Sequence, residues 1–113
     1  MRRHSKYGNA RVRRGDEKFD SIAEFNRYRQ LQMLERAGHI TGLTRQVSFI
    51  LAPKVVINGV AKRSLIYRAD FGYTETGSNR QVVEDVKGVL TPVYKIKRHL
   101  MKAVHGIDIL ETK

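Results

Sequence analysis

Residues 65–88 read LIYRADFGYTETGSNRQVVEDVKG, and this stretch decides the fold that the sequence predicts. Apolar and β-branched residues dominate Leu65–Tyr73 and Gln81–Lys87, as is typical of strands. Between the two runs lies TETGSN, whose small and polar residues favour a turn, followed by Arg80. We therefore predict two neighbouring strands that pair as a hairpin.

Acidic side chains occupy matching places in these two strands. Because side chains alternate along a strand, Asp85 and Lys87 share one face and Glu84 points to the other. Pairing across the turn brings Asp70 close to Asp85. Two neighbouring carboxylates repel each other, and a hard cation such as Mg²⁺ relieves this by taking oxygen ligands. Such an ion lowers the pKa of a water and stabilises charge on a phosphate, which Lys87 could contact.

Three features favour a metal site over the alternative, an ordinary strand whose charges face solvent. Acids in apolar strands are costly to bury unless they are paired or bound to metal. Gly88 directly follows Lys87 and allows a substrate backbone to approach closely. A basic helix is predicted next, where it can hold phosphates.

Towards the N-terminus, Ser21 and Gly38 bracket a predicted helix. Ser21 followed by Glu24 matches a capping box, and Gly38 suits the left-handed residue after a helix. The cap explains Glu24 without any catalysis. However, Tyr28 and Leu31 follow at i+4 and i+7, so Glu24 lies on a face that carries apolar residues and looks inward. Glu24 is therefore either a cap or a member of the metal site.

Two further β signals lie between this helix and the hairpin. Val47, Phe49 and Leu51 alternate along the chain, which indicates a strand with one buried face. Asn58-Gly59 between β-branched residues is the strongest short hairpin signal.

A last helix is predicted after the hairpin. Thr91-Pro92 is a good N-cap and N1 pair, Gly106 ends the helix, and Ile107–Leu110 could form a short closing strand. The order predicts an α/β domain over residues 16–113, with a mixed central sheet flanked by helices. The apolar stripe of this helix consists of Val93, Ile96, Leu100 and Val104.

The charge balance predicts a polyanionic partner. Of 113 residues, 22 are Lys or Arg and 11 are Asp or Glu, a net charge of +11 that attracts nucleic acid. A soluble basic protein without a specific ligand is the alternative. Residues 1–15 carry six cations and no acid, so we expect a flexible arm that either orders on a phosphate backbone or is a tail without function. The expected DNA contacts are Arg2, Arg3, Lys6, Arg11, Arg13, Arg14, Arg68, Lys95, Lys97, Arg98 and Lys102.

Composition also bounds the compartment. Cysteine is absent, which excludes disulfides and thiolate metal sites and suits a reducing cytoplasm. The longest apolar run is far too short for a membrane span, and no apolar segment follows the basic N-terminus as in a secretory signal. We expect a cytoplasmic protein.

With these residues in place, the sequence resembles two known groups of proteins. A helix-borne Glu24, then Asp70, then Asp85-x-Lys87, then a basic helix is the order found in PD-(D/E)XK nucleases, although Glu is commoner than Asp before x-Lys. The chain also resembles a phage- and prophage-encoded family of small basic proteins with a KYGN-type arm. The matching stretches are SKYGNARV, KFDSIAEFNRYRQLQMLERAGHITGL, RQVSFIL, YRADFGY and VVEDVKGVLTPVYKIKRHLM. More distantly, YRADF and EDVKG are similar to segments of phage Holliday-junction endonucleases of the endonuclease I type.

The resemblance implies a restriction-endonuclease-like fold and a defined site. Asp70 and Asp85 would be metal ligands, aided by a backbone carbonyl near Val86, Lys87 would be the catalytic lysine, and Glu24 would hold a second ion or its water. It implies one or two Mg²⁺ ions, with Mn²⁺ able to substitute, and hydrolysis of DNA in a bacterial host cytoplasm. Gln46 occupies the place where many such nucleases carry a glutamine near the site, or it simply satisfies backbone groups.

The expected substrate follows from the lack of a recognisable base-reading module in the sequence. No base-reading module is visible in 113 residues, and a protein that contacts mainly phosphates recognises shape. Branched DNA and a homodimer that makes two symmetric cuts are therefore expected. The alternatives are a nonspecific DNA nuclease and a non-catalytic basic DNA-binding protein.

Overall fold

The computed structural model describes residues 11–14 and 17–113. Arg2, Arg3 and Lys6 of the predicted arm lie outside the described residues. Part of the range predicted as an arm is a short strand, which pairs with the strand that follows it. The elements in chain order are β1 (Val12–Arg14), β2 (Glu17–Phe19), α1 (Ile22–Arg36), β3 (Ile40–Ala52), β4 (Val55–Ile57), β5 (Val60–Lys62), β6 (Leu65–Glu75), β7 (Gln81–Val86), α2 (Pro92–His105) and β8 (Leu110–Thr112).

A four-stranded mixed sheet with the order β3-β6-β7-β8 forms the centre of the molecule. β6 pairs antiparallel with both β3 and β7, and β8 runs parallel to β7. The prediction of an α/β protein with a mixed sheet and helices is thus confirmed, as is the hairpin between β6 and β7. The closing strand starts later than predicted because Ile107 and Ile109 pack on the core cluster beside α2 and leave only the next residues to pair with β7.

Local sequence signals set the ends of both helices. The Ser21 hydroxyl accepts a hydrogen bond from the Glu24 backbone N–H, and the Thr91 hydroxyl accepts one from the Tyr94 N–H. Gly38, with φ of 83°, follows α1 and Gly106, with φ of 68°, caps α2, in the left-handed conformation that glycine adopts at little cost. Neither helix is long and apolar enough to cross a membrane, among the residues that the structure describes.

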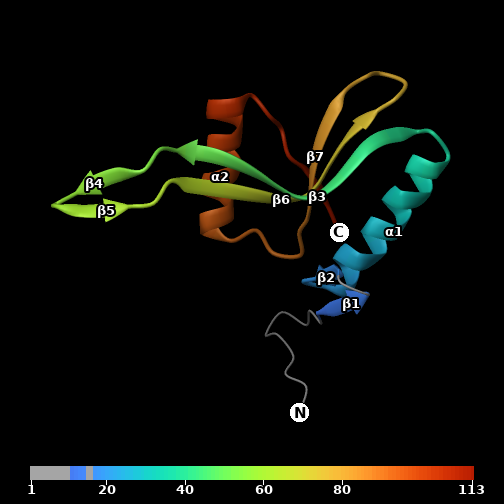
Figure 1. Cartoon of the computed structure of the whole chain (residues 1–113), viewed down its shortest axis with the longest axis horizontal. Helices are drawn as coiled ribbons and strands as arrows, with labels where there is room; N and C mark the ends of the chain where they lie inside the picture. The colour runs from blue at the N-terminus through green and yellow to red at the C-terminus, as the bar shows by residue number, and fades with distance from the viewer. Residues whose placement is uncertain (1–10, 15–16) are drawn as a thin grey trace, which may run out of the picture.

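The helices cover opposite faces of the sheet. On β7, Val82 belongs to a core cluster with Leu31 of α1, whereas its neighbour Val83 belongs to one with Met101 of α2. Since successive strand residues point to opposite faces, the order of layers is helix, sheet, helix. The strands β3 and β6 run between the two helices and extend beyond α2 into the β4–β5 hairpin (Figure 1).

The apolar stripe of α2 is mostly uncovered. The helix buries Tyr94 and Met101 against the sheet, while Val93, Ile96 and Val104 are exposed. A stripe of this kind normally faces a core. Here Tyr94 and Met101 take that place, and the Tyr94 hydroxyl donates to Glu111 of β8 at 2.5 Å.

Candidate functional site

A polar row crosses the sheet from β3 to β7. Phe71 pairs with Glu84, so continuing the register by one residue places Asp70 opposite Asp85. On the other side, β3 residues 45 and 47 pair with β6 residues 71 and 69, which places Gln46 opposite Asp70. The predicted proximity of the two aspartates is thus confirmed, and Gln46 lies in the same row.

Both β3 and β6 change the face they present at this row. Ala69 packs in the core cluster beside α2, but Phe71, two residues on, packs in the cluster beside α1. In a regular strand these two side chains would share a face. Gln46 has a φ of 55°, a left-handed conformation that is uncommon for residues other than glycine and that locally turns the strand. Beyond the row, β6 no longer pairs with β7, and the two strands form a fork.

At the start of this fork, the side chains of the two aspartates accept hydrogen bonds from backbone N–H groups of the facing strand, in place of backbone carbonyls. Asp70 Oδ2 accepts a hydrogen bond from the Val86 N–H at 2.8 Å, and Asp85 Oδ1 accepts one from the Asp70 N–H at 3.3 Å. Val86, proposed from the sequence as a ligand through its carbonyl, thus contacts Asp70 through its N–H. The other oxygen of Asp85 accepts from the Tyr67 hydroxyl at 2.5 Å and lies 3.2 Å from Lys87 Nζ.

Glu24 reaches the row from the first turn of α1. Its carboxylate, 3% exposed, accepts from the backbone N–H of Asp20 at 3.0 Å and from the Gln46 side-chain amide at 3.2 Å. Arg45 Nη2 lies 3.8 Å from the same carboxylate. The Ser21 hydroxyl thus caps the Glu24 N–H, while the Glu24 side chain lies in the polar row; the metal-binding role considered from the sequence stays a prediction.

Burial and mutual repulsion dominate the electrostatics of the row. The pKa of Asp70 is raised to about 8, first by burial and then by hydrogen bonding and charge repulsion with Asp85, and the Glu24 charge adds to this. The pKa of Glu24 is also raised, chiefly by burial, although the Asp20 N–H and Arg45 oppose the shift. Ionising Asp70 or Glu24 therefore costs free energy in the folded protein.

The raised pKa of Asp70 predicts a pH-dependent stability. A carboxyl with a raised pKa stabilises the fold while it is protonated, and that contribution is lost as the pH rises from about 4 to about 8. Asp70→Asn should therefore raise the free energy of unfolding at pH 8 by on the order of 2 kcal/mol, discounted for partial exposure, and change it little at pH 4. Urea denaturation at both pH values measures the effect. An equal change at the two pH values would contradict it.

A basic pocket of about 420 Å³ opens in the fork beside Asp85. Its cationic lining residues are Arg68 of β6, Lys87, which follows β7, and Lys97 of α2. Thr91 also lines the pocket, and none of its lining residues is acidic. Lys87 Nζ also lies 4.3 Å from the centre of the Tyr94 ring, a cation–π contact that holds the amine beside Asp85. The structure thus brings together the predicted residues Asp70, Asp85, Lys87, Arg68 and Lys97.

Other predicted DNA contacts lie away from this pocket. Lys95, Arg98 and Lys102 line a separate pocket of about 310 Å³ on another side of α2. Arg98 pairs with Glu111 at 3.1 Å and Lys102 with Asp108 at 2.8 Å. Arg11 and Arg13 are exposed near β1, and nothing is described of the Arg14 side chain.

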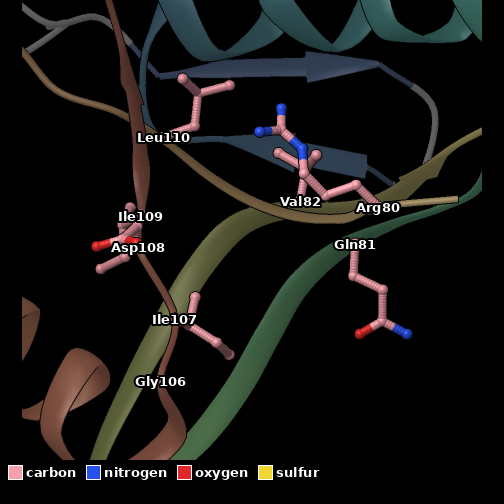
Figure 2. A pocket seen from close by; sticks show the side chains of 8 residues that line it. All are labelled: Arg80, Gln81, Val82, Gly106, Ile107, Asp108, Ile109 and Leu110. Carbon is pink, nitrogen blue, oxygen red and sulfur yellow. The ribbon is translucent and has the colours of Figure 1, made fainter. Parts of the chain in front are cut away.

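A third pocket, of about 410 Å³, lies between the start of β7 and the segment that follows α2 (Figure 2). Arg80 and Asp108 are its charged residues, and isoleucine, leucine and valine side chains supply much of the rest. None of the predicted site residues lines it, so it is not part of the candidate site.

Two site residues were missed from the sequence. Tyr67 is three residues before Asp70 and would face away from it in a regular strand; the change of face at the row brings its hydroxyl to Asp85. Arg45 stacks 3.9 Å above the Phe19 ring and reaches towards Glu24. Neither carries a local sequence signal, because each contact depends on how distant elements pack.

An ion pair between α1 and β7 holds the helix in place over the row. Glu84, 0% exposed, accepts from Arg27 Nε at 2.6 Å and Nη2 at 2.9 Å. The Tyr73 hydroxyl donates to the same carboxylate at 2.7 Å, and the pKa of Tyr73 is raised to about 12, first by burial and then by this bond. The prediction that Glu84 faces away from Asp85 is confirmed. Since Arg27 is one turn from Glu24, the pair also positions Glu24.

The donor chemistry of the row fits a hard divalent cation held by two carboxylates. Asp70 and Asp85 offer oxygen ligands only, and the pKa of Asp70 is raised first by burial and then by its hydrogen bond to Asp85 and repulsion from its charge. Among the described residues, no three or more His, Cys, Asp or Glu side chains come close enough together to hold one ion. In this conformation Glu24 therefore does not share a coordination sphere with both aspartates.

Fold and site together define an α/β protein with a carboxylate-rich, lysine-flanked site in the fork of a mixed sheet. A family model described as a protein of unknown function, DUF1064, matches residues 4–108, and the chain belongs to this family. Comparison with curated proteins and with solved structures gives no match.

Proposed function

We propose that this chain is a Mg²⁺-dependent DNA endonuclease of the PD-(D/E)XK type. The observation that carries the proposal is the juxtaposition of Asp70, Asp85 and Lys87 at the mouth of a pocket lined by cations. Two aspartates and a lysine beside a basic pocket are the groups that phosphodiester hydrolysis needs. In a bacterial host the enzyme would act in the cytoplasm, on DNA of phage or prophage origin.

Each group has a defined task in this proposal. Asp70 and Asp85 would hold Mg²⁺, which when bound supplies an activated water and neutralises charge on the phosphate. Arg68 and Lys97 would position the DNA backbone in the pocket, and Lys87 would stabilise the negative charge that grows on the phosphoryl oxygens. Glu24 would orient a water or hold a second ion on the α1 side of the row.

Tyr67 would keep Asp85 ready for this task. Its hydroxyl donates to one carboxylate oxygen while the Asp70 N–H donates to the other, so the Asp85 side chain is fixed before any ligand arrives. Fixed outer hydrogen bonds of this kind orient the groups that bind a metal.

We propose branched DNA as the preferred substrate, because the cationic pocket would contact phosphates and the described residues include no base-reading module such as a zinc finger or helix-turn-helix. The test is incubation with a four-way junction, a flap, a linear duplex and single-stranded DNA, each with Mg²⁺ and with EDTA. Mg²⁺-dependent cleavage with the junction cut fastest supports the proposal. Equal rates on all four substrates would leave a nonspecific nuclease, and no cleavage of any with Mg²⁺ or Mn²⁺ would leave a DNA-binding protein.

The N-terminal cations are expected to contribute salt-dependent affinity. Deleting residues 1–10 removes Arg2, Arg3 and Lys6 and spares β1. At roughly 0.9 per phosphate contact, the log–log slope of DNA affinity against salt should fall by up to about three units. Filter binding between 50 and 300 mM salt measures the slope. An unchanged slope would show that these residues do not contact the backbone.

A further inference from the structure

Exposed apolar side chains gather in one half of the molecule. Of the sixteen large hydrophobic residues that are exposed in the described part of the chain, twelve lie within residues 50–66 or 89–104. These ranges hold the β4–β5 hairpin, the strand ends beside it, and α2 with the loop before it. The half of the molecule that contains α1 exposes few by comparison. The asymmetry points to an interaction surface rather than to scattered exposure.

The β4–β5 hairpin is apolar on both faces. Its cross-strand pairs are Val55 with Lys62, Val56 with Ala61, and Ile57 with Val60. Because side chains alternate, Val56 lies on one face while Val55 and Ile57 lie on the other. The hairpin projects beyond α2, at the end of the molecule opposite α1 (Figure 1). A two-stranded hairpin is marginally stable in water unless a partner covers it.

The uncovered strip of α2 is the second component. Val93, Ile96 and Val104 are spaced by three and eight residues, so they follow one side of the helix, next to the half-buried Leu100. Ile66 joins Val93 in the wall of the basic pocket, so apolar surface continues from α2 onto β6.

The extent of this surface matches what a stable dimer needs. From their exposed fractions, the twelve side chains present on the order of 1,000 Å². This total includes both faces of the hairpin, and each partner of a standard interface contributes about 800 Å², so covering most of it would suffice for a stable interface. The projecting hairpin and the uncovered strip of α2 lie apart in one molecule, so they can cover each other only between two molecules. In a dimer with a two-fold axis, this contact forms twice.

We propose that two copies of this chain associate through these surfaces, with the β4–β5 hairpin of each copy lying on the α2 strip of the other. The dimer would then contain two copies of the polar row, one from each chain. This inference does not depend on catalysis, and its test requires no DNA.

Sedimentation velocity of the full chain without DNA, at 0.5–50 µM, provides the test. The chain of 13.0 kDa should sediment as a dimer. Since both copies are strongly basic, the dimer should tighten between about 50 and 300 mM salt as screening weakens the repulsion. A monomer at all concentrations and salt conditions would overturn the proposal.

Matched variants locate the interface. Val56→Lys on the hairpin and Ile96→Lys on α2, at positions 71% and 62% exposed, should each weaken the dimer at least tenfold. Met33→Lys adds the same charge at a 65% exposed position on α1 and should change the dimer constant less than twofold. Circular dichroism checks that all three variants fold. Equal effects of the three, or no effect of the first two, would overturn the assignment.

Cross-linking tests the arrangement itself, since the chain contains no cysteine. Val56→Cys protein mixed with Ile96→Cys protein should form a mixed disulfide that Met33→Cys mixed with Ile96→Cys does not. If Val56→Lys instead weakens DNA binding while the parent chain stays monomeric, the hairpin serves DNA and the proposal fails.

Discussion

Asp85→Asn is expected to abolish Mg²⁺-dependent cleavage of DNA while leaving DNA binding at least as tight as in the parent chain. Asparagine keeps one oxygen that can accept from the Asp70 N–H, and its amide NH2 can donate to the Tyr67 hydroxyl oxygen in place of the second carboxylate oxygen, so the fork between β6 and β7 should remain intact. It removes the charge that would hold the metal beside the basic pocket. Because groups in one site act as a unit, the loss of rate should exceed about 10³-fold.

Binding and cleavage respond in opposite directions because the lost charge faces the phosphates. Removing a carboxylate beside Lys87 lowers repulsion of the DNA backbone, so affinity stays equal or rises. Asp108→Asn is the matched control, since this carboxylate is 83% exposed and lies outside the row; its cleavage rate should stay within about twofold. Cleavage that survives in Asp85→Asn would refute the metal assignment and with it the nuclease proposal.

The largest effect on stability is expected for Arg27→Ala. The substitution leaves the Glu84 charge fully buried without its guanidinium partner, which costs about 3–5 kcal/mol of unfolding free energy. Arg29→Ala removes the same side chain from an exposed position of α1 and should cost less than about 0.5 kcal/mol. Urea denaturation at pH 7 measures both. A loss below about 1 kcal/mol for Arg27→Ala would mean that Glu84 is compensated by Tyr73 and Thr112 alone.

Adding Glu84→Gln to Arg27→Ala tests the cause of the loss. Glutamine removes the buried charge but still accepts the Tyr73 hydroxyl, so the double variant should be more stable than Arg27→Ala. Additive losses would contradict an electrostatic origin. The cleavage rate well below the melting temperature should also fall in Arg27→Ala, because the helix that carries Glu24 loses its connection to β7.

Much of the fold was predictable because its signals are local. Ser21, Thr91 and Gly106 cap helices through contacts within one turn, and Asn58-Gly59 closes a hairpin with both residues at positive φ. These contacts involve residues close in sequence, so a single chain carries the information. The face that α2 buries was not predictable, since Tyr94 and Met101 pack against strands distant in sequence and Tyr94 also bonds Glu111 of β8.

For the candidate site, the spacing of residues in the sequence predicted that the acids and Lys87 lie close together. The side chains that contact them depend on tertiary packing. The period-two alternation of β7 placed Asp85 and Lys87 on one face, and the turn length placed Asp70 opposite. Tyr67 and Arg45 could not be found this way, because their contacts cross between strands or elements far apart in sequence. For Glu24, the cap at Ser21 and a place of its side chain in the polar row occur together, while a role in metal binding stays a prediction.

The sequence by itself determined the two helices, the paired strands and the adjacent acids, because caps, turns and alternation act over a few residues. The tertiary structure alone decided the change of face at Gln46 and Asp70, the fork that opens the basic pocket, and the bare surfaces of the hairpin and α2. These features depend on which side of the sheet each helix covers. That choice depends on the apolar surface that all helices and strands bury together, which no local stretch of sequence specifies.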